Sequence, residues 1–469
     1  MAAALHTINT PLAQTDVDHH QTSHLKNLQG NILKSHGRKH TANVFLKFKV
    51  GHEAAARAWV HTSLRPRVTT AHAQLKAAEA FNGGGVDGGV FHAFLLSAAG
   101  YSYFGKNTTN FTDPSFKLGS QVSTTSLNDP AVGTWDVGFQ GTIHAMVLMA
   151  DPHAAKMRFM ARELAIEVAP FADVLQIEFG DQQVNERGDG IEHFGYVDGR
   201  SQPLMLDSDL SGQTDGVSLW DPRTGPAQVL VADPFGGPNA SGSYFVFRKL
   251  EERVKDFKVQ EQVLASALGL TGAARELAGA LVIGRFEDGT PVTLSDKPLI
   301  ESSTDPNDQS VPNNFDFRAD LDGSKCPFHS HIRKSNPRGA SPGGLAAEEP
   351  RHMARRGITY GDRAKDTFDD ISKMPEGGVG LLFMSYQRSI VDQFEFIQKS
   401  WVNDPSFPRN ATGLDPVIGQ HGAMAPAAQQ WPKAWGDSSV KVAFDFRDFV
   451  VMKGGEYFFA PSLSGIGNL

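Results

Sequence analysis

The chain has 469 residues and a net charge of −8, and 40% of its residues are hydrophobic and 20% charged. One hydrophobic core normally serves no more than about 250–300 residues, so at least two cores are expected. The composition excludes a disordered or fibrous protein, the acidic balance argues against a nucleic-acid partner, and the single cysteine, Cys326, excludes an internal disulfide.

Residues 1–26 lack the basic segment and the sustained apolar segment of a secretory signal. No stretch of the chain approaches the ~18 consecutive apolar residues of a membrane span. We therefore expect a cytoplasmic protein without a membrane partner, and export by an unconventional route stays open. Residues 1–30 are expected to form an N-terminal arm.

The first half of the chain alternates between strand and helix patterns. Helical spacing of apolar residues is found over 57–80 and 151–168, and the second helix is expected to have Asp151 as its cap and Pro152 in its first turn. Four segments are typical of strands: residues 42–50, 89–98, 141–150 and 171–180. The order β-α-β-β-α-β is that of a ferredoxin-like unit.

The second half repeats this order less regularly. It contains three strand patterns and two helix patterns, over residues 242–250, 259–270, 378–389, 391–402 and 449–461. A long insertion rich in Pro, Asp and Asn, residues 288–344, separates the first helix from the middle strand. The sequence therefore predicts an α+β protein of two ferredoxin-like halves. We expect an N-terminal domain over 31–220 and a C-terminal domain over 221–469.

The insertion contains the segment CPFHSHIRKSNPRG, residues 326–339. Pro327 and the pair Asn336-Pro337 predict a short helix between them. Residues two positions apart on a helix point about 200° away from each other, which argues against a metal site made by both His329 and His331. Two alternatives stay open: one satisfied histidine on a basic surface helix, and a thiolate ligand to haem iron through Cys326.

Two further segments carry charged residues that could act in catalysis, and a third carries apolar residues that could line a site. In HFGYVDGRSQP, two glycines bracket Asp198, so that a tight turn can present its carboxylate. In RHMARRGITYG, Arg355 and Arg356 precede a probable strand. In GLLFMSYQRS, Leu381 and Phe383 are expected to share one face of a strand, with the residue between them on the other face.

Taken together, these segments resemble one family, the dye-decolourising peroxidases, and in particular its longer subfamilies. The segments that carry the resemblance occur in the family's order: LQGNILKSHGRKHTANVFLKF, GYVDG, CPFHSHIRKSNPRG, RRGITYG and GGEYFFAPSL. The resemblance implies a fold of the dimeric α+β barrel type, with haem in the C-terminal half. This fold agrees with the two ferredoxin-like halves predicted from periodicity.

The resemblance also implies roles for single residues. His331 would be the axial ligand to the haem iron, with His329 as its nearest rival. Asp198 would be the distal acid–base residue. Arg355 would be the distal arginine, with Arg356 as the competing assignment.

Four more residues would surround the cofactor by the same resemblance. Leu381 and Phe383 would line the distal pocket. Arg333 would contact a haem propionate. Asp415 would accept the other N–H of the axial imidazole, fixing the ring and raising its basicity.

The function implied is that of a peroxidase with one haem b per chain. It would use hydrogen peroxide to oxidise dyes, phenolics and other aromatic donors in one-electron steps through a ferryl intermediate. The alternative is a haem carrier, or a protein that releases iron from haem, without peroxidase turnover. Bulky donors would need a surface electron relay, for which the aromatic candidates are Tyr244, Tyr386, Tyr457, Trp401, Trp431 and Trp435. The sequence does not predict the oligomeric state.

Overall fold

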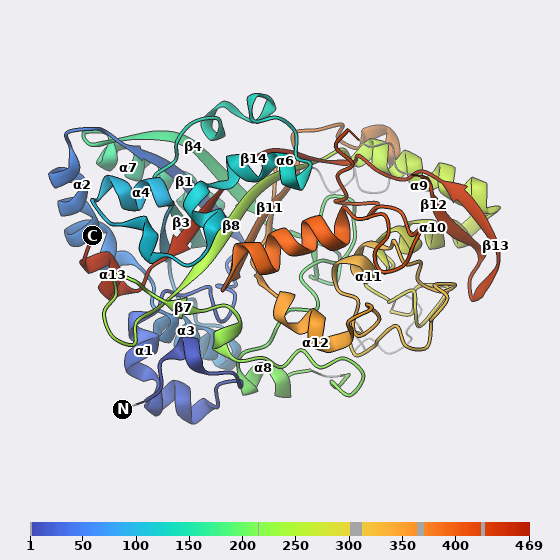
Figure 1. The fold of residues 1–469 in the computed structure, drawn as a ribbon, viewed down its shortest axis with the longest axis horizontal. Helices are drawn as coiled ribbons and strands as arrows, with labels where there is room; N and C mark the ends of the chain where they lie inside the picture. The colour runs from blue at the N-terminus through green and yellow to red at the C-terminus, as the bar shows by residue number, and fades with distance from the viewer. Residues whose placement is uncertain (1, 214, 301–311, 364–369, 424–426) are drawn as a thin grey trace.

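The computed structural model describes residues 2–213, 215–300, 312–363, 370–423 and 427–469. Strands from both halves of the chain join in one sheet of ten strands, with helices packed around it (Figure 1).

The N-terminal half forms the first ferredoxin-like unit. Its strands β1 (His40–Phe48), β2 (Phe91–Leu96), β3 (Ala145–Asp151) and β4 (Ala172–Asp181) lie in the antiparallel order β2-β3-β1-β4. Every residue of β2 and β3 is buried, which explains why these two segments contain few polar residues. The four predicted strands are confirmed.

The helix predicted over 57–80 is wrong as a single element. The chain forms α2 (Glu53–Trp59) and α3 (Ala71–Gly84), separated by irregular helical turns around Pro66. Proline has no backbone N–H to continue a helix, and Thr70 begins α3 by accepting the Ala73 N–H at 3.1 Å.

The helix after β3 is α7 (Ala154–Val168), and it begins later than predicted. Asp151 is still part of β3, and its carboxylate accepts the His153 N–H at 3.0 Å and binds Lys156 at 2.6 Å. The expected cap therefore serves the connection between strand and helix, while His153 takes the cap position.

The C-terminal half repeats the strand order of the first unit. Its strands β8 (Ser241–Glu252), β10 (Ile358–Tyr360), β11 (Gly380–Gln387) and β14 (Val450–Ala460) lie in the order β10-β11-β8-β14. Two short strands, β7 (Val231–Ala232) and β9 (Ala354–Arg355), pair with β8 and β11. The predicted α+β class with two ferredoxin-like halves is confirmed. The domain boundaries near residues 30 and 220 stay a prediction.

Helices α9 (Val254–Leu268) and α10 (Glu276–Ile283) follow β8, and two wide helical turns, η13 (Ile390–Glu395) and η14 (Ile397–Val402), follow β11. Within the described residues, no single helix is long and apolar enough to cross a membrane. One pair of neighbouring helices, Val254–Leu268 and Gly272–Ile283, meets the criteria of length and composition together, with a bend of 113° between them.

The two units meet through both edges of their four-stranded sheets. β14 of the second unit pairs with β2 of the first through Phe459 and Leu96. At the opposite end, the Thr359 hydroxyl of β10 donates to the Asp181 carbonyl of β4 at 2.6 Å. A shared core takes side chains from strands of both units, including Phe45, Met146, Phe245, Leu382, Met384 and Phe458.

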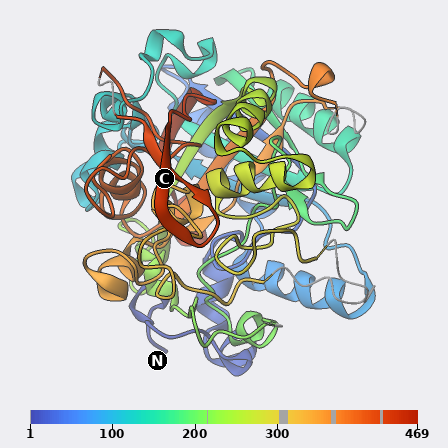
Figure 2. The same cartoon turned by 90° about the vertical axis from the view of Figure 1, so that its right-hand side faces the viewer.

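The insertion between α10 and β9 contains α11 (His331–Ser335) and α12 (Gly344–Glu348). Residues 301–311 of this insertion lie outside the described residues. The hairpin of β12 (Gln429–Ala434) and β13 (Asp437–Phe444) forms the right-hand end of Figure 1 and faces the viewer in Figure 2. The chain between η14 and this hairpin carries Asp415. It contacts the insertion through the hydrogen bond between Asp415 and His331.

Candidate active site

The predicted axial histidine is the first residue of α11. Ser330 before it has an extended backbone, with ψ 137°. His331 Nδ1 lies 2.9 Å from Asp415 Oδ2. A carboxylate can only accept, so Nδ1 carries the proton and Nε2 keeps its lone pair when the ring is neutral. The side chain of His331 is 23% exposed, so this imidazole is open to a ligand.

Asp415 is a fully buried acceptor. Its Oδ1 accepts the N–H groups of Val417 and Ile418 at 2.8 and 3.0 Å, which leaves Oδ2 for His331. Three donors satisfy this carboxylate in the interior. The hydrogen bond that the resemblance implied between Asp415 and the imidazole is therefore present in the structure.

Lys334, one turn along α11, binds the helix to the segment that leads to Asp415. Its buried ammonium group donates to the carbonyls of Asp404, Phe407 and Gly413 at 2.7, 2.8 and 2.5 Å. An ammonium group has three donors, and all three are used here. The helix and the loop are thus fixed to each other, and the bond between His331 and Asp415 is fixed with them.

Charges around His331 show which side chains lie near it. Burial disfavours the protonated ring, but the Asp415 carboxylate outweighs burial, and the pKa of His331 is raised. Arg355 acts to lower this pKa and Asp198 to raise it. Coulomb interactions weaken with distance and are screened by water, so both side chains lie within electrostatic reach of the imidazole, although neither is hydrogen-bonded to it among the described contacts. The structure thus brings together three residues that are far apart in the sequence.

His329 has different surroundings. Its side chain is 2% exposed, and its ring packs edge-on against Trp431 with 4.2 Å between ring centroids. The helix predicted from Pro327 begins at His331 instead, so the helical argument against a shared metal ion does not hold. The two imidazoles are separated because His329 is enclosed against Trp431 while His331 is open and bound to Asp415.

Asp198 lies in a turn that follows the small hairpin of β5 (Gln183–Val184) and β6 (Gly190–Ile191). Its backbone N–H donates to the Gly190 carbonyl at 2.9 Å. Gly195 and Gly199 have φ of 103° and 79°, a region that residues with a side chain seldom adopt. The two glycines therefore shape the turn as predicted, and the Asp198 side chain is exposed.

Arg355 is attached to the same turn. Its guanidinium donates to the Arg200 carbonyl at 2.6 Å, and its backbone N–H donates to the Gln202 side chain at 3.0 Å. The Arg356 guanidinium donates to the carbonyls of Asn31 and Ile32 at 2.7 and 2.8 Å, and to the backbone carbonyl of Arg355 at 2.8 Å. Arg355, and not Arg356, is therefore the arginine whose side chain binds the segment that follows Asp198, and its distal role stays a prediction.

Leu381 and Phe383 lie on β11 and are partly exposed, whereas Leu382 between them is buried in the shared core. The predicted alternation along this strand is confirmed. The ring of Phe383 packs 5.8 Å from that of Phe394, so one side of its ring is supported from η13.

Arg333 is not placed where a propionate partner would have to lie. Its guanidinium is 1% exposed and donates to an Asp320 carboxylate oxygen and the Asp320 carbonyl at 2.7 Å, and to the Cys326 carbonyl at 2.5 Å. A partner of a bound propionate would be open to the pocket. Arg333 instead ties α11 to the preceding turn.

Cys326 is buried in the core below α10, where its Sγ would lie 3.6 Å from a Cβ at Gly284. Burial raises the pKa of the Cys326 thiol to about 12. A helix N-terminus would lower this pKa, but α11 begins five residues later and the thiol lies in a hydrophobic cluster. The thiolate alternative of the sequence analysis is therefore not supported.

These residues fit a haem group. Within the described residues, no cluster of three or more His, Cys, Asp or Glu side chains is arranged to hold a bare metal ion. Haem needs only one protein ligand of the kind that His331 offers, because its own nitrogens supply the rest. The imidazole of His331, with Asp198 and Arg355 acting on its charge, supplies the kinds of group that a haem site needs.

Comparison with known proteins identifies the family. The family model described as the DyP dimeric alpha+beta barrel domain matches residues 27–173. The multifunctional dye peroxidase DyP2 of Amycolatopsis sp. is 43% identical over 476 residues, which cover 98% of this chain and 99% of that protein. The chain belongs to the dye-decolorizing peroxidases. These are haem enzymes that use hydrogen peroxide.

Further dye-decolorizing peroxidases agree with this assignment. The peroxidase msp1 of Mycetinis scorodonius is 30% identical, and the match covers 94% of this chain and 86% of that protein. The solved structure of DyP2 has a TM-score of 0.91 and 41% identity, covering 98% of this chain and 99% of that one. The DyP-type peroxidase of Anabaena sp. has a TM-score of 0.87 and 38% identity, covering 95% of each chain.

Sequence reasoning missed several residues of this dye-decolorizing peroxidase site. Lys334 received no role because its three partners lie 70 to 79 residues away. Arg355 is held by Gln202 and by the carbonyl of Arg200, which precede it by more than 150 residues in the sequence. No local pattern in the sequence connects such pairs.

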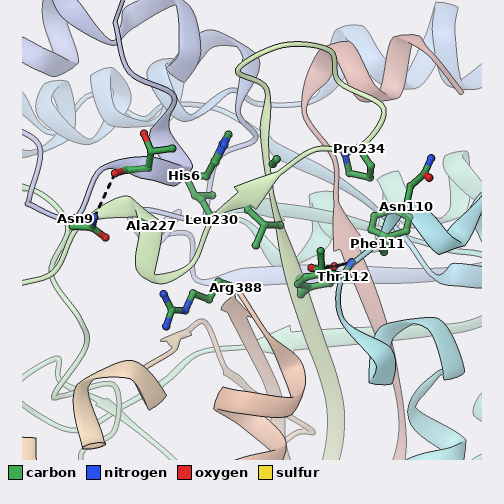
Figure 3. Close-up of a pocket in the computed structure, with 13 residues that line it drawn as sticks. His6, Asn9, Asn110, Phe111, Thr112, Ala227, Leu230, Pro234 and Arg388 are labelled. Carbon is green, nitrogen blue, oxygen red and sulfur yellow. Dashed lines mark hydrogen bonds between the residues drawn. The ribbon is translucent and has the colours of Figure 1, made fainter. Parts of the chain in front are cut away.

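A separate cavity of about 460 Å³ lies beside the N-terminal arm (Figure 3). His6, Phe111, Leu230 and Arg388 are among the residues around it, and so is Tyr244, one of the relay candidates. None of the predicted haem-site residues lines this cavity, so it does not include the site at His331.

Proposed function

We propose that this dye-decolorizing peroxidase binds one haem b per chain and oxidises dyes, phenolics and other aromatic donors with hydrogen peroxide. One observation carries the proposal: the charge of an imidazole held by a buried carboxylate is influenced by an exposed carboxylate and by a guanidinium from distant parts of the chain. A haem carrier would need the imidazole but would have no use for the other two groups.

In this proposal His331 would bind the haem iron through Nε2, while Asp415 holds Nδ1. The negative charge of Asp415 increases the electron density that the ring offers, as outer-shell carboxylates do for histidine ligands. Leu381 and Phe383 form an apolar wall that limits the water around the bound peroxide. Haem supplies, when bound, the capacity to accept oxidising equivalents and return them to donors.

Asp198 acts on the proton of hydrogen peroxide. A carboxylate oxygen of Asp198 takes the proton from one peroxide oxygen and gives it to the other, so that the second oxygen leaves as water. Arg355 keeps its positive charge and stabilises the negative charge that builds up while the O–O bond breaks. The Arg200 carbonyl and Gln202 hold Arg355 beside Asp198 for this task.

Two donor molecules then complete the reaction. Each gives one electron, two protons are taken up with these electrons, and the remaining peroxide oxygen is released as a second water. Aromatic donors suit this role because their radicals are stabilised by delocalisation.

The test uses protein reconstituted with haem and purified from free pigment. Addition of hydrogen peroxide is expected to change the visible absorption rapidly, and an anthraquinone dye or a phenol is expected to restore the starting spectrum while it is oxidised. Simple bleaching of the pigment without donor oxidation would contradict the proposal and favour a haem carrier. Location in the cytoplasm stays a prediction, to be checked by fractionation of the producing cells.

A further inference from the structure

Two glutamates, half-buried Glu192 and buried Glu252, hold the base of the turn that carries Asp198. Glu192 Oε2 accepts the Phe194 N–H at 2.6 Å, and its Oε1 accepts the Tyr196 N–H at 2.8 Å. Glu252, the last residue of β8, accepts the His193 N–H at 3.0 Å. The backbone N–H groups of His193, Phe194 and Tyr196 therefore all donate to these two carboxyl groups.

The same turn is closed by its own backbone. The N–H of Gly195 donates to the Glu192 carbonyl at 3.0 Å, and the N–H of Glu192 donates to the Tyr196 carbonyl at 3.2 Å. Asp198 follows Tyr196 by two residues. Glu192 fixes the backbone at Phe194 and Tyr196. The orientation of Asp198 depends on this part of the backbone.

The two carboxyl groups also interact with each other. Burial raises the pKa of Glu192 to about 7, and burial followed by the charge of Glu192 raises the pKa of Glu252 well above its ordinary value. Two carboxylates in contact cannot both ionise at low cost, so one proton is shared between them at neutral pH. Both oxygens of Glu192 already accept backbone N–H groups, and Glu252 has the higher proton affinity. Glu252 therefore carries the shared proton and donates it to Glu192.

Other charged groups surround this pair. Lys258 of α9 lowers the pKa of Glu192 and Asp198 raises it, after the larger effects of burial and the backbone N–H groups. Lys258 is itself bound to Glu261 at 3.0 Å and Glu287 at 2.5 Å.

Among the described residues, the other neighbours of the pair are His193, Arg363 and two valines. His193 is buried, its Nε2 lies 2.9 Å from the Tyr360 carbonyl, and burial lowers its pKa to about 4. Arg363 donates to the His193 carbonyl, on the backbone side of the turn. On the strands beside Glu252, the neighbours are Val379, whose carbonyl accepts the Glu252 N–H, and Val450.

We propose that Glu192 is a positioning residue for Asp198, and that Glu252 keeps Glu192 in place through the shared proton. The inference rests on the proposed acid–base role of Asp198. Loss of the shared proton at high pH leaves two negative charges in contact, and their repulsion loosens the turn. Glu192 and Glu252 touch neither peroxide nor cofactor in this proposal.

Two substitutions separate the roles of the pair. In Glu192→Gln one backbone N–H faces an amide NH₂ group, so the turn loses an acceptor. In Glu252→Gln the amide NH₂ can donate to Glu192 in place of the proton, and the amide oxygen can accept the His193 N–H. Glu251→Gln is the matched control, because Glu251 is the neighbouring acid on β8 and binds the Gly378 N–H at 3.1 Å instead.

The experiment uses haem-loaded protein and three readouts: the rate of the spectral change with hydrogen peroxide across pH, hydrogen exchange of the peptide 193–200, and the infrared absorption of protonated carboxyl groups. Glu192→Gln is expected to slow the reaction with peroxide about 10–100-fold, the usual effect of losing an outer-shell partner, and to speed exchange of the peptide. Glu252→Gln is expected to remove the infrared band of the shared proton and the fall of the parent rate at alkaline pH. Glu251→Gln is expected to match the parent in all three.

Parent-like rates and exchange in Glu192→Gln would overturn the proposal, and so would loss of haem or of the fold in this variant, since the role would then be general stability. If the rate with hydrogen peroxide still falls at alkaline pH in Glu252→Gln, the proposal of a shared proton is overturned. Asp198→Asn is measured alongside: if it reacts as fast as the parent, the proposed function fails, whereas a slow Asp198→Asn with a fast Glu192→Gln removes only this inference.

Discussion

The two sides of the candidate pocket are built differently. The histidine side consists of His331, Asp415 and Lys334, and the two charged residues beside the histidine in this group are buried with their hydrogen bonds complete. The aspartate side consists of Asp198, Arg355 and the turn over 192–199. Its backbone is held by buried groups, but the Asp198 side chain itself is exposed.

This contrast separates holding a cofactor from moving a proton. A ligand must keep one position, and buried, satisfied hydrogen bonds provide that. A proton carrier must exchange protons with its substrate, so its carboxylate has to remain accessible. Changes on the histidine side should therefore release haem, whereas changes on the aspartate side should leave haem bound and slow the reaction with peroxide.

The largest effect is expected from His331→Ala. Without the imidazole no side chain of α11 offers a ligand to the iron, so the variant should bind haem weakly or not at all. Haem titration followed by visible absorption measures this. His329→Ala is the matched control: it should bind haem as the parent does and lose about 1–3 kcal/mol of unfolding free energy, because a buried ring against Trp431 is removed. Loss of haem in His329→Ala alone would move the ligand by two residues.

On the aspartate side, Asp198→Asn should keep haem and slow the reaction with hydrogen peroxide by about 10²–10⁴-fold. Asparagine has the same shape as aspartate but cannot take the proton. Stopped-flow absorption after mixing with peroxide measures the rate. Asp221→Asn, which changes an exposed aspartate paired with Arg223, is the control and should leave the rate unchanged. A parent-like rate in Asp198→Asn would contradict the acid–base role.

Arg355→Leu should slow the same step by about 10²–10³-fold, because a fixed positive donor is lost from the place where negative charge develops. Arg356→Leu separates this effect from packing. Its guanidinium binds the carbonyls of Asn31 and Ile32, so its loss should lower the melting temperature while the rate with peroxide stays near that of the parent. The reverse result would assign the distal role to Arg356.

Asp415→Asn tests how much of the histidine side depends on charge. The variant can still place an oxygen near His331 Nδ1, but it then turns its NH₂ group toward the N–H groups of Val417 and Ile418. Haem affinity is expected to fall about 10–100-fold, less than in His331→Ala. The rate of haem transfer to an excess of a haem-scavenging protein measures this. Transfer as slow as in the parent would mean that ring orientation does not depend on the carboxylate.

The same contrast shows how far sequence reasoning reaches. Strands such as β2 and β3 were predictable because their apolar runs follow directly from burial on both faces. The glycines around Asp198 were predictable because a positive φ restricts the residue type. These features depend on neighbours within a few positions.

Features that depend on distant partners were not predictable. Arg333 was expected at a propionate because a basic residue beside the ligand has that role in the family, but Asp320 binds it. The pair Glu192 and Glu252 lies 60 positions apart, and nothing in either segment marks the contact. Such contacts follow from the packing of two whole units, which periodicity does not describe.

The smallest effect is expected from Cys326→Ser. Unchanged haem binding in this variant would support His331 as the ligand. The raised pKa of about 12 leaves roughly one thiol in a thousand ionised at pH 9, so a thiol reagent should react with Cys326 only after unfolding. The serine variant should bind haem with the spectrum of the parent and lose about 1–2 kcal/mol of unfolding free energy, because a hydroxyl enters an apolar core. The decisive measurement is the spectrum of the reduced carbon-monoxide complex. A strongly red-shifted band in the parent that disappears in Cys326→Ser would make the thiolate the ligand, and the histidine side would then have to be rebuilt around Cys326.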